Sequence, residues 1–149
     1  MRLEPLLRAE ITLAAPQELG DAPHGRRRII AITGGSFRGE RLSGRVLPGG
    51  ADWQVIRADG VAELDARYTL ETADRALIYV RNFGYRHGPP DVIRRLAAGE
   101  PVDPALYYMR TTPRFETGAA RYSWLNALIC VATGARRAAS VELEVFAVR

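Results

Sequence analysis

The stretch RFETGAARYSWLN, residues 114–126, gathers side chains that could do chemistry. Glu116 stands upstream of Tyr122, Trp124 and Asn126, and the last three fall on one face of any extended strand. A carboxylate in a partly apolar cavity has its pKa raised by desolvation, which suits it to acid or base catalysis near neutral pH. The pattern predicts that Glu116 moves a proton beside an aromatic wall, with Asn126 orienting a carbonyl or carboxylate. If the face points outward, the same residues form a contact surface instead.

Arg110 lies on the strand expected just before this stretch. Its guanidinium could hold a ligand carboxylate in a two-point grip. It could also pair with Glu116 and so lower the pKa of that acid. The plain structural alternative is a surface ion pair, which is the commoner situation of arginine and glutamate and contributes little stability.

A second acid follows a sharp turn in VLPGGADW, residues 46–53. One interpretation places Asp52 or Trp53 at the mouth of a cavity, with Asp52 as the alternative acid or base. The other makes Asp52 a residue that caps local backbone amides after the turn. The residues alone do not separate the two.

Other familiar sites are missing from the sequence. The glycine-rich GGSFRG, residues 34–39, is followed by Glu40 and Arg41 where a phosphate loop needs Lys and then Ser or Thr, so we interpret its glycines as bending a strand. The two histidines and Cys130 have no metal-ligand spacing. No cofactor and no metal are therefore expected.

Composition narrows the class of protein further. The chain has 149 residues, 47% hydrophobic and 26% charged, which is ordinary for one globular domain. All 21 basic residues are arginine and they are spread along the chain, whereas nucleic-acid binders concentrate basic residues and interleave aromatics. One cysteine excludes an internal disulfide, and no apolar run is long enough to span a membrane. We expect a cytoplasmic protein that binds neither nucleic acid nor membrane.

Periodicity favours strands almost everywhere. Residues 61–71 alternate apolar and polar side chains, Asp59-Gly60 predicts a tight hairpin before them, and residues 122–133 are expected to form another strand. Residues 90–98 form the one expected helix, because Pro90 suits a first turn and Gly99 a stop. Eight or nine short strands with one short helix predict an all-β fold over residues 1–149. A closed antiparallel barrel is preferred to a sandwich, because closure removes sheet edges and eight strands leave room for one small ligand.

Four blocks of the sequence together resemble one family. They are residues 25–53, Asp59-Gly60, residues 66–72 and residues 107–126, and the similarity covers nearly the whole chain. The family is the bacterial and fungal domain of unknown function thirty-two thirty-seven, also called uncharacterised protein family three-eleven. The resemblance implies a small barrel similar to allene oxide cyclase, dirigent or lipocalin-like barrels. The first two of these bind hydrophobic molecules and guide cyclisation or coupling mainly by shape.

The family brings no established reaction, so the resemblance implies positions and not catalytic roles. The residues inside its motif blocks are Asp52, Trp53, Tyr68, Arg110, Phe115, Glu116, Tyr122, Trp124 and Asn126. Arg75 departs from the Asp-Gly pair expected in relatives, which should alter a turn and leave the cavity untouched.

Three functions remain open on the sequence. The first is a cofactor-independent isomerase, cyclase or hydratase-like enzyme, with Glu116 or Asp52 moving the proton. The second is a binding protein of the same architecture in which nothing turns over. The third is an interaction module whose aromatic face makes a homo-oligomer. In the first two, the partner is a small, partly apolar molecule, Arg110 and Asn126 orient it, and Trp53, Tyr68, Phe115, Tyr122 and Trp124 form the ligand-binding walls.

Overall fold

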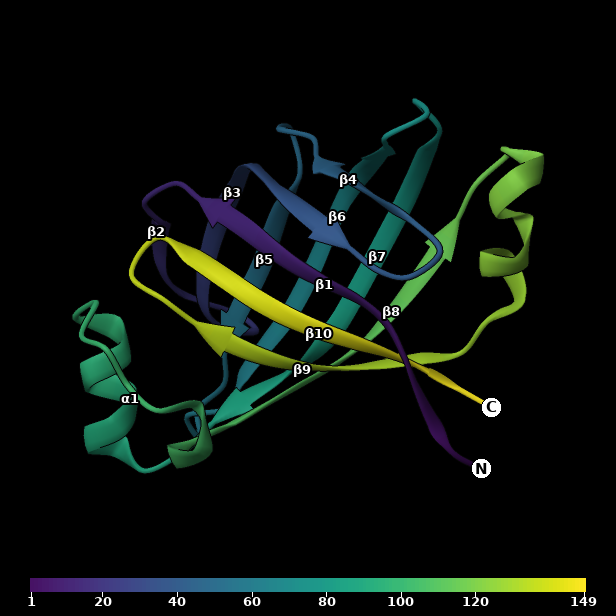
Figure 1. The fold of residues 1–149 in the computed structure, drawn as a ribbon. Coiled ribbons are helices and arrows are strands. Elements are labelled where there is room, and N and C mark those ends of the chain that lie inside the picture. Colours follow the sequence, from purple (N-terminus) through teal and green to yellow (C-terminus); the bar gives the residue numbers. More distant parts are fainter.

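A computed structural model describes residues 1–149 as a strand-rich fold (Figure 1). The strands are β1 (Leu3–Leu13), β2 (Gln17–Ala22), β3 (Gly25–Arg38), β4 (Ser43–Val46), β5 (Ala51–Ile56), β6 (Ala62–Thr72), β7 (Leu77–His87), β8 (Tyr108–Glu116), β9 (Cys130–Arg136) and β10 (Ser140–Val148). The helical segments are α1 (Pro90–Ala97) and two 3₁₀ turns, η1 (Pro104–Leu106) and η2 (Ala120–Ala127).

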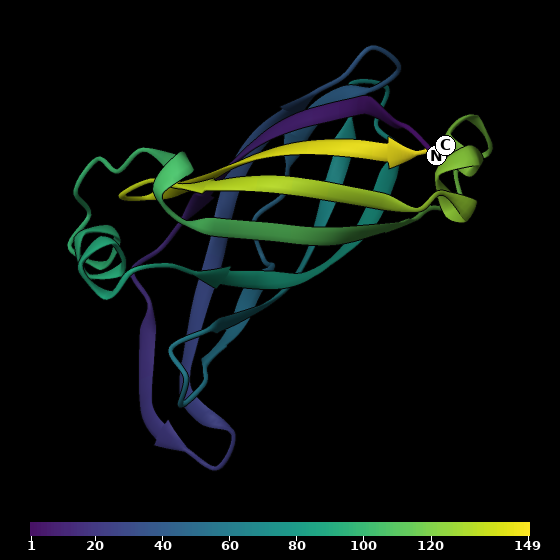
Figure 2. The same ribbon diagram turned by 90° about the horizontal axis from the view of Figure 1, so that it is seen from below.

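The sheet closes on itself. Neighbouring strands run antiparallel in the order β1-β10-β9-β8-β7-β6. The short strands β4 and β5 both lie between β6 and β3, and each pairs with a different part of these two longer strands. Pairing of β1 with β3 then completes the ring, while β2 pairs only with β3 in a hairpin that extends away from the barrel (Figure 2). With β4 and β5 sharing one position, eight positions surround the barrel, so the predicted closed antiparallel barrel is confirmed.

Local signals explain several of these elements. Gly60 has a φ of +86° in the turn between β5 and β6, as the Asp59-Gly60 pair predicted. At Gly35, inside β3, a Cβ would lie 2.1 Å from the carbonyl oxygen of Glu10 on β1. Glycine there lets the two strands approach closely enough to close the barrel, which agrees with its interpretation as a strand-bending residue.

The interior is divided into two apolar clusters. A cluster of 19 buried residues fills one end, where η2 inserts Tyr122 and Leu125, and a cluster of 7 fills the other, where α1 contributes Val92 and Leu96. Figure 1 and Figure 2 agree in placing α1 and η2 at opposite ends of the barrel. The helix predicted over residues 90–98 is therefore confirmed, and it has a structural role as one lid of the core.

The strand predicted over residues 122–133 is wrong in its first half. Residues 120–127 form the 3₁₀ segment η2, and β9 begins only at Cys130. Asn126 closes the connection, because its Oδ1 accepts from the amide of Thr117 at 2.8 Å and its Nδ2 donates to the carbonyl of Thr117 at 2.9 Å. Leu125 is fully buried, so this end of the core is filled by a compact turn that an extended strand could not provide.

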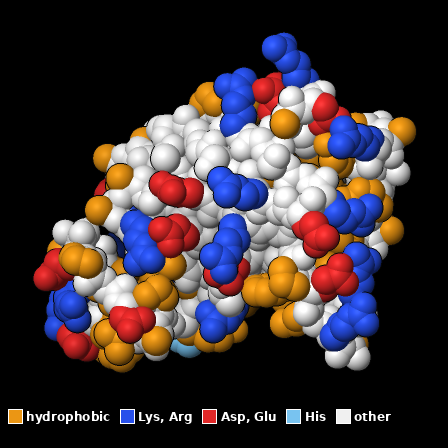
Figure 3. All heavy atoms as spheres, in the orientation of Figure 1, with side chains coloured by type: hydrophobic (Ala, Val, Ile, Leu, Met, Phe, Trp, Pro, Cys, Tyr) orange, Lys and Arg blue, Asp and Glu red, His pale blue; other side chains and the backbone are white.

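The outer surface mixes both signs of charge. On the face drawn in Figure 3, arginines and acidic side chains are interspersed and do not form a single basic area. Several exposed arginines pair with acids, including Arg8 with Glu144 at 2.9 Å and Arg45 with Glu71 at 2.9 Å. None of the helices has the length and apolar character that crossing a membrane requires.

Candidate functional site

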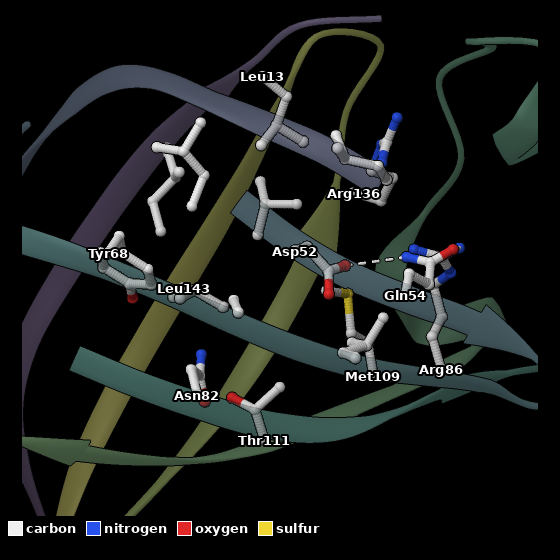
Figure 4. Close-up of a pocket in the computed structure, with 16 residues that line it drawn as sticks. Leu13, Asp52, Gln54, Tyr68, Asn82, Arg86, Met109, Thr111, Arg136 and Leu143 are labelled. Carbon is white, nitrogen blue, oxygen red and sulfur yellow. Dashed lines mark hydrogen bonds between the residues drawn. The ribbon is translucent and has the colours of Figure 1, made fainter. Parts of the chain in front are cut away.

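A cavity lies inside the barrel between the two apolar clusters (Figure 4). Its volume is about 60 Å³, several times the roughly 10–15 Å³ that one water molecule needs. Ten of its 16 lining residues are hydrophobic. The polar ones come from strands far apart in the chain and include Asp52, Gln54, Asn82, Arg86, Thr111 and Arg136.

Two polar atoms in the cavity wall have no partner. The Oδ1 of Asn82 and the Oγ1 of Thr111 are buried and make no hydrogen bond. Asn82 is 5% exposed and Thr111 is 4% exposed, so neither atom is solvated at the outer surface. They lie on β7 and β8, which are hydrogen-bonded neighbours, and in Figure 4 their side chains lie close together in the cavity. Buried polar groups are nearly always satisfied by a protein group or an ordered water, so two unpartnered atoms on one cavity wall are unusual.

Asp52 faces the same cavity from β5. Its Oδ1 accepts from the backbone amide of Asp65 at 2.8 Å and its Oδ2 accepts from Nε2 of Gln54 at 3.0 Å. Burial raises the pKa of the Asp52 carboxyl, although these two hydrogen bonds and the charge of Arg86 oppose the shift. A carboxyl with a raised pKa exchanges a proton more readily near neutral pH.

Gln54 connects this acid to a group of arginines. Its Oε1 accepts from Nη1 of Arg28 at 3.2 Å and from Nη2 of Arg86 at 3.5 Å, while its Nε2 donates to Asp52. Gln54 is 1% exposed, so its amide orientation is fixed by these partners. The chain of bonds therefore holds the carboxyl of Asp52 in one position within the cavity.

Arg86 and Arg136 place two further guanidinium groups at the cavity wall. Burial, and then the positive charge of Arg136, lower the pKa of Arg86 to about 10. Burial and the charge of Arg28 lower the pKa of Arg136 as well. The backbone amide of Arg136 donates to the hydroxyl of Tyr107 at 2.9 Å, which fixes this end of β9.

Of the residues predicted from the sequence, two line the cavity. Asp52 does so as described, and Tyr68 reaches it from β6. Tyr68 is 6% exposed and burial raises the pKa of its phenol well above the usual range, so it remains neutral. The structure thus brings Asp52, the alternative acid, and Tyr68, a predicted wall residue, to the same cavity.

Three other predicted residues point away from the cavity. Glu116 and Arg110 both lie on the outward, exposed face of β8. Arg110 stacks on Tyr108, with its guanidinium carbon 5.4 Å from the ring centre, and forms no ion pair with Glu116. Trp53 is 40% exposed on the outside of β5.

The remaining four belong to the core or to its η2 lid. Phe115 and Tyr122 are buried in the larger apolar cluster, and Trp124 packs against it. The guanidinium carbon of Arg41 lies over the Trp124 ring, 3.8 Å from the ring centre. The hydroxyl of Tyr122 donates to Asp74 at 2.7 Å, and Asn126 holds the loop as described above. The sequence prediction of one shared strand face for Tyr122, Trp124 and Asn126 is wrong, because these residues belong to a 3₁₀ turn.

Sequence reasoning missed five polar residues of the cavity, although a signal for them exists. The inward positions of β7 are Ile78, Val80, Asn82, Gly84 and Arg86, so an apolar alternation is interrupted by an amide and a guanidinium. Thr111 interrupts the inward face of β8 in the same way. The other two missed residues are Gln54 and Arg136. Nowhere do three His, Cys, Asp or Glu side chains come together in a way that could hold a metal ion.

Comparison with known proteins places this barrel in a family. Residues 1–148 match the family model described as "Protein of unknown function (DUF3237)". The UPF0311 protein RPA1785 of Rhodopseudomonas palustris is 50% identical over 126 residues, which cover 85% of this chain and 82% of that protein. The crystal structure of RPA1785 is similar with a TM-score of 0.94 and 43% identity, over 99% of this chain and 97% of that chain.

Two further solved structures share the architecture. A beta-barrel like protein from Acinetobacter baumannii has a TM-score of 0.87 at 45% identity, covering 99% of this chain and 96% of that one. An enzyme from Penicillium herquei has a TM-score of 0.70 at 22% identity, covering 97% and 93%. At that identity the likeness indicates a shared fold alone.

Proposed function

The chain belongs to the DUF3237 family of proteins of unknown function, and we propose that it binds a small, partly apolar organic molecule inside its barrel. The observation that carries the proposal is the pair of unpartnered atoms, Asn82 Oδ1 and Thr111 Oγ1, in a cavity with mostly apolar walls. Small-molecule pockets combine apolar walls with a few convergent polar groups in this way.

The volume limits what the cavity can hold. At about 60 Å³ it is less than half the size of an engineered cavity of about 150 Å³ that binds benzene. The ligand is therefore a molecule of few heavy atoms, or the reactive end of a longer one. Leu13, Arg136 and Val141 are only partly buried along the cavity wall, so the remainder of a longer ligand would leave past them.

We further propose that Asp52 gives the cavity catalytic capacity as an acid or base. In an isomerisation the Asp52 carboxylate takes a proton from one atom of the ligand and the resulting acid returns it to another, so no oxidant or reductant is required. Thr111 and Asn82 would hold an oxygen substituent during the transfer. Glu116 retains no support for this role, because it lies on the outer face of β8. The fold is compatible with catalysis, since the similar Penicillium herquei protein is described as an enzyme.

A binding protein without turnover would use the same cavity. The substitution Asp52→Asn distinguishes the two functions, because it keeps the shape of the side chain and removes its ability to exchange a proton. Retained binding with lost turnover would identify an enzyme. A protein in which no ligand is converted, with or without the substitution, is a binding protein. In either case we propose a cytoplasmic location, consistent with a single, buried cysteine whose pKa burial raises to about 11.

The test is binding of small organic molecules followed by amide NMR spectra of the whole chain. The probes are short oxo acids, hydroxy acids, enones and phenols. We expect a saturable shift centred on β7 and β8 for at least one class, weakened by Asn82→Leu and by Thr111→Val. The matched control is Thr69→Val, because the side chain of Thr69 lies on the opposite face of β6 from the inward-facing Tyr68. Shifts that are unaffected by both cavity substitutions would contradict the proposal.

A second proposal, self-association, is favoured by an apolar area on the outside of the barrel. Three aromatic side chains are exposed on the outward faces of β7 and β8: Phe83 (43%), Tyr85 (39%) and Tyr108 (44%). The rings of Phe83 and Tyr85 pack edge to face, with 5.3 Å between their centres. Exposed apolar areas of this kind often mark protein contacts. If copies associate here, Tyr108→Ser should lower the molar mass measured by light scattering. Tyr79→Ser is the control, because Tyr79 lies at the opposite end of the β7–β8 pair from Tyr108, and it should leave the molar mass unchanged.

A further inference from the structure

We propose that the ligand of the barrel cavity carries a carboxylate group, and that Arg86 and Arg136 bind it at the end of the cavity nearest α1. The inference rests on the proposed binding function and names the chemical class of its ligand. It follows from the arginines at that end of the cavity, two of which have no carboxylate in direct contact.

The charges are three guanidiniums, and only one of them has an acidic partner. Arg28 forms an ion pair with Glu18 at 2.9 Å. Neither Arg86 nor Arg136 has a carboxylate oxygen within 4.0 Å. Buried arginines are normally paired, because an isolated charge is costly to remove from water.

Arg86 is the more unusual of the two. It is 8% exposed, yet its only side-chain hydrogen bond runs to Oε1 of Gln54 at the long distance of 3.5 Å. Most of its five N–H donors therefore have no hydrogen-bond partner within the protein. Arg136 uses its Nε to donate to the carbonyl of Arg137 at 2.9 Å, which leaves its terminal nitrogens without a partner.

Asp52 is not a direct partner of either arginine. Its two oxygens accept from the amide of Asp65 and from Gln54, so its carboxylate is held away from direct contact with Arg86. Its charge does raise the pKa of both Arg86 and Arg136, but burial and mutual repulsion among the arginines outweigh it. A bound anion would relieve that repulsion.

A carboxylate matches this geometry better than other anions of similar charge. Guanidinium groups present parallel N–H donors that fit the two oxygens of a carboxylate. The cavity is too small for a bulky acid, and its walls next to the arginines are apolar, including Leu64 and Met109. At the other polar position, Asn82 Oδ1 can only accept, so a hydroxyl on the same ligand would complete it. The class that fits is therefore a short carboxylic acid, with a hydroxy acid satisfying both positions.

The experiment compares butyrate with butyramide and 3-hydroxybutyrate, which share a carbon chain and differ in charge or in one hydroxyl. Titrations of the whole protein are followed by amide NMR at β7, β8 and β9. We expect butyrate to bind at least about tenfold more tightly than butyramide, and 3-hydroxybutyrate to bind more tightly than butyrate. Arg136→Met should weaken butyrate binding at least about tenfold and leave butyramide binding unchanged.

Arg137→Met is the matched control, because Arg137 is the exposed neighbour of Arg136 and pairs with Glu142 at 3.1 Å. Arg86→Met tests the buried position, and Arg136→Met keeps the proposal testable if that variant does not fold. Equal binding of butyrate and butyramide to the unaltered protein would overturn the carboxylate inference while leaving the binding function intact. Equal butyrate binding by Arg136→Met and Arg137→Met would also overturn it. Failure of every probe to bind would refute the proposed function and the inference with it.

Discussion

Replacing Thr111 with Val should stabilise the ligand-free protein. Thr111 is 4% exposed and its Oγ1 has no hydrogen-bond partner, so folding removes a hydroxyl from water without replacing its bonds. Burying an unsatisfied hydroxyl costs about 1–3 kcal/mol in protein mutational data. Valine has nearly the same shape and no polar atom. We expect the free energy of unfolding to rise by about 1–2 kcal/mol, which corresponds to an increase in Tm of about 2–8 °C for a chain of this size.

Urea denaturation and thermal unfolding measure this gain directly, with Thr69→Val as the control. The hydroxyl of Thr69 lies on the outward face of β6, so its loss should change stability by no more than about 0.5 kcal/mol. The same Thr111→Val protein should bind the cavity ligand more weakly. A loss of stability, or a change no larger than the control, would show that the Thr111 hydroxyl is satisfied without a ligand and would remove the main support for the proposed binding site.

Three further predictions concern residues at or beyond the cavity. Asp52→Asn removes a carboxyl whose folded pKa is raised, so its ionised form penalises the fold. As pH rises from about 4 through the raised pKa, the unfolding free energy of the wild type should fall relative to that of the variant, and below about 4 the difference should stay constant. Urea unfolding across this range measures the difference. A wild type that gains stability relative to the variant as pH rises would contradict the prediction. Asn126→Ala should cost about 1–2 kcal/mol of unfolding free energy, because both its hydrogen bonds to Thr117 are lost, while ligand titrations stay unchanged; an altered affinity would place Asn126 back at the site. Arg75→Gly relieves a left-handed φ of +68° and should gain up to about 1 kcal/mol after the entropic cost of glycine, whereas a clear loss would mean that the Arg75 side chain contributes contacts.

The barrel was predictable because strand periodicity is a local property. In β6 the alternation of Leu64, Tyr68 and Leu70 with polar residues survives in the structure as an inward and an outward face. The hairpin at Asp59-Gly60 and helix α1 were predictable for the same reason, since each depends on a few adjacent residues. Closure needs β1 to pair with β3 on one side and with β10, at the other end of the chain, on the other side. No local pattern specifies these pairings, and closure followed only from the argument that a barrel removes sheet edges.

The site was less predictable because it depends on which strands become neighbours. Tyr122, Trp124 and Asn126 look like a strand face in isolation, but the long-range contact of Tyr122 with Asp74 and the bonds of Asn126 to Thr117 stabilise a turn. The shared face also led sequence reasoning to prefer Glu116 to Asp52. Spacing within one segment cannot show that β5, β7 and β8 bring Asp52 and Thr111 to the same cavity.

The polar residues on inward faces are the more reliable guide to function in this fold. A barrel that only needed stability would continue the apolar pattern of Ile78 and Val80 along β7, yet the next inward side chains are Asn82 and Arg86. The Oδ1 of Asn82 has no hydrogen-bond partner, Arg86 has no carboxylate partner, and both side chains line the same cavity. Violations of local rules are expected where a binding site requires them and the rest of the structure compensates. Here, the two apolar clusters at either end supply that compensation, so the middle of the barrel can keep polar groups for which we propose a ligand as the partner.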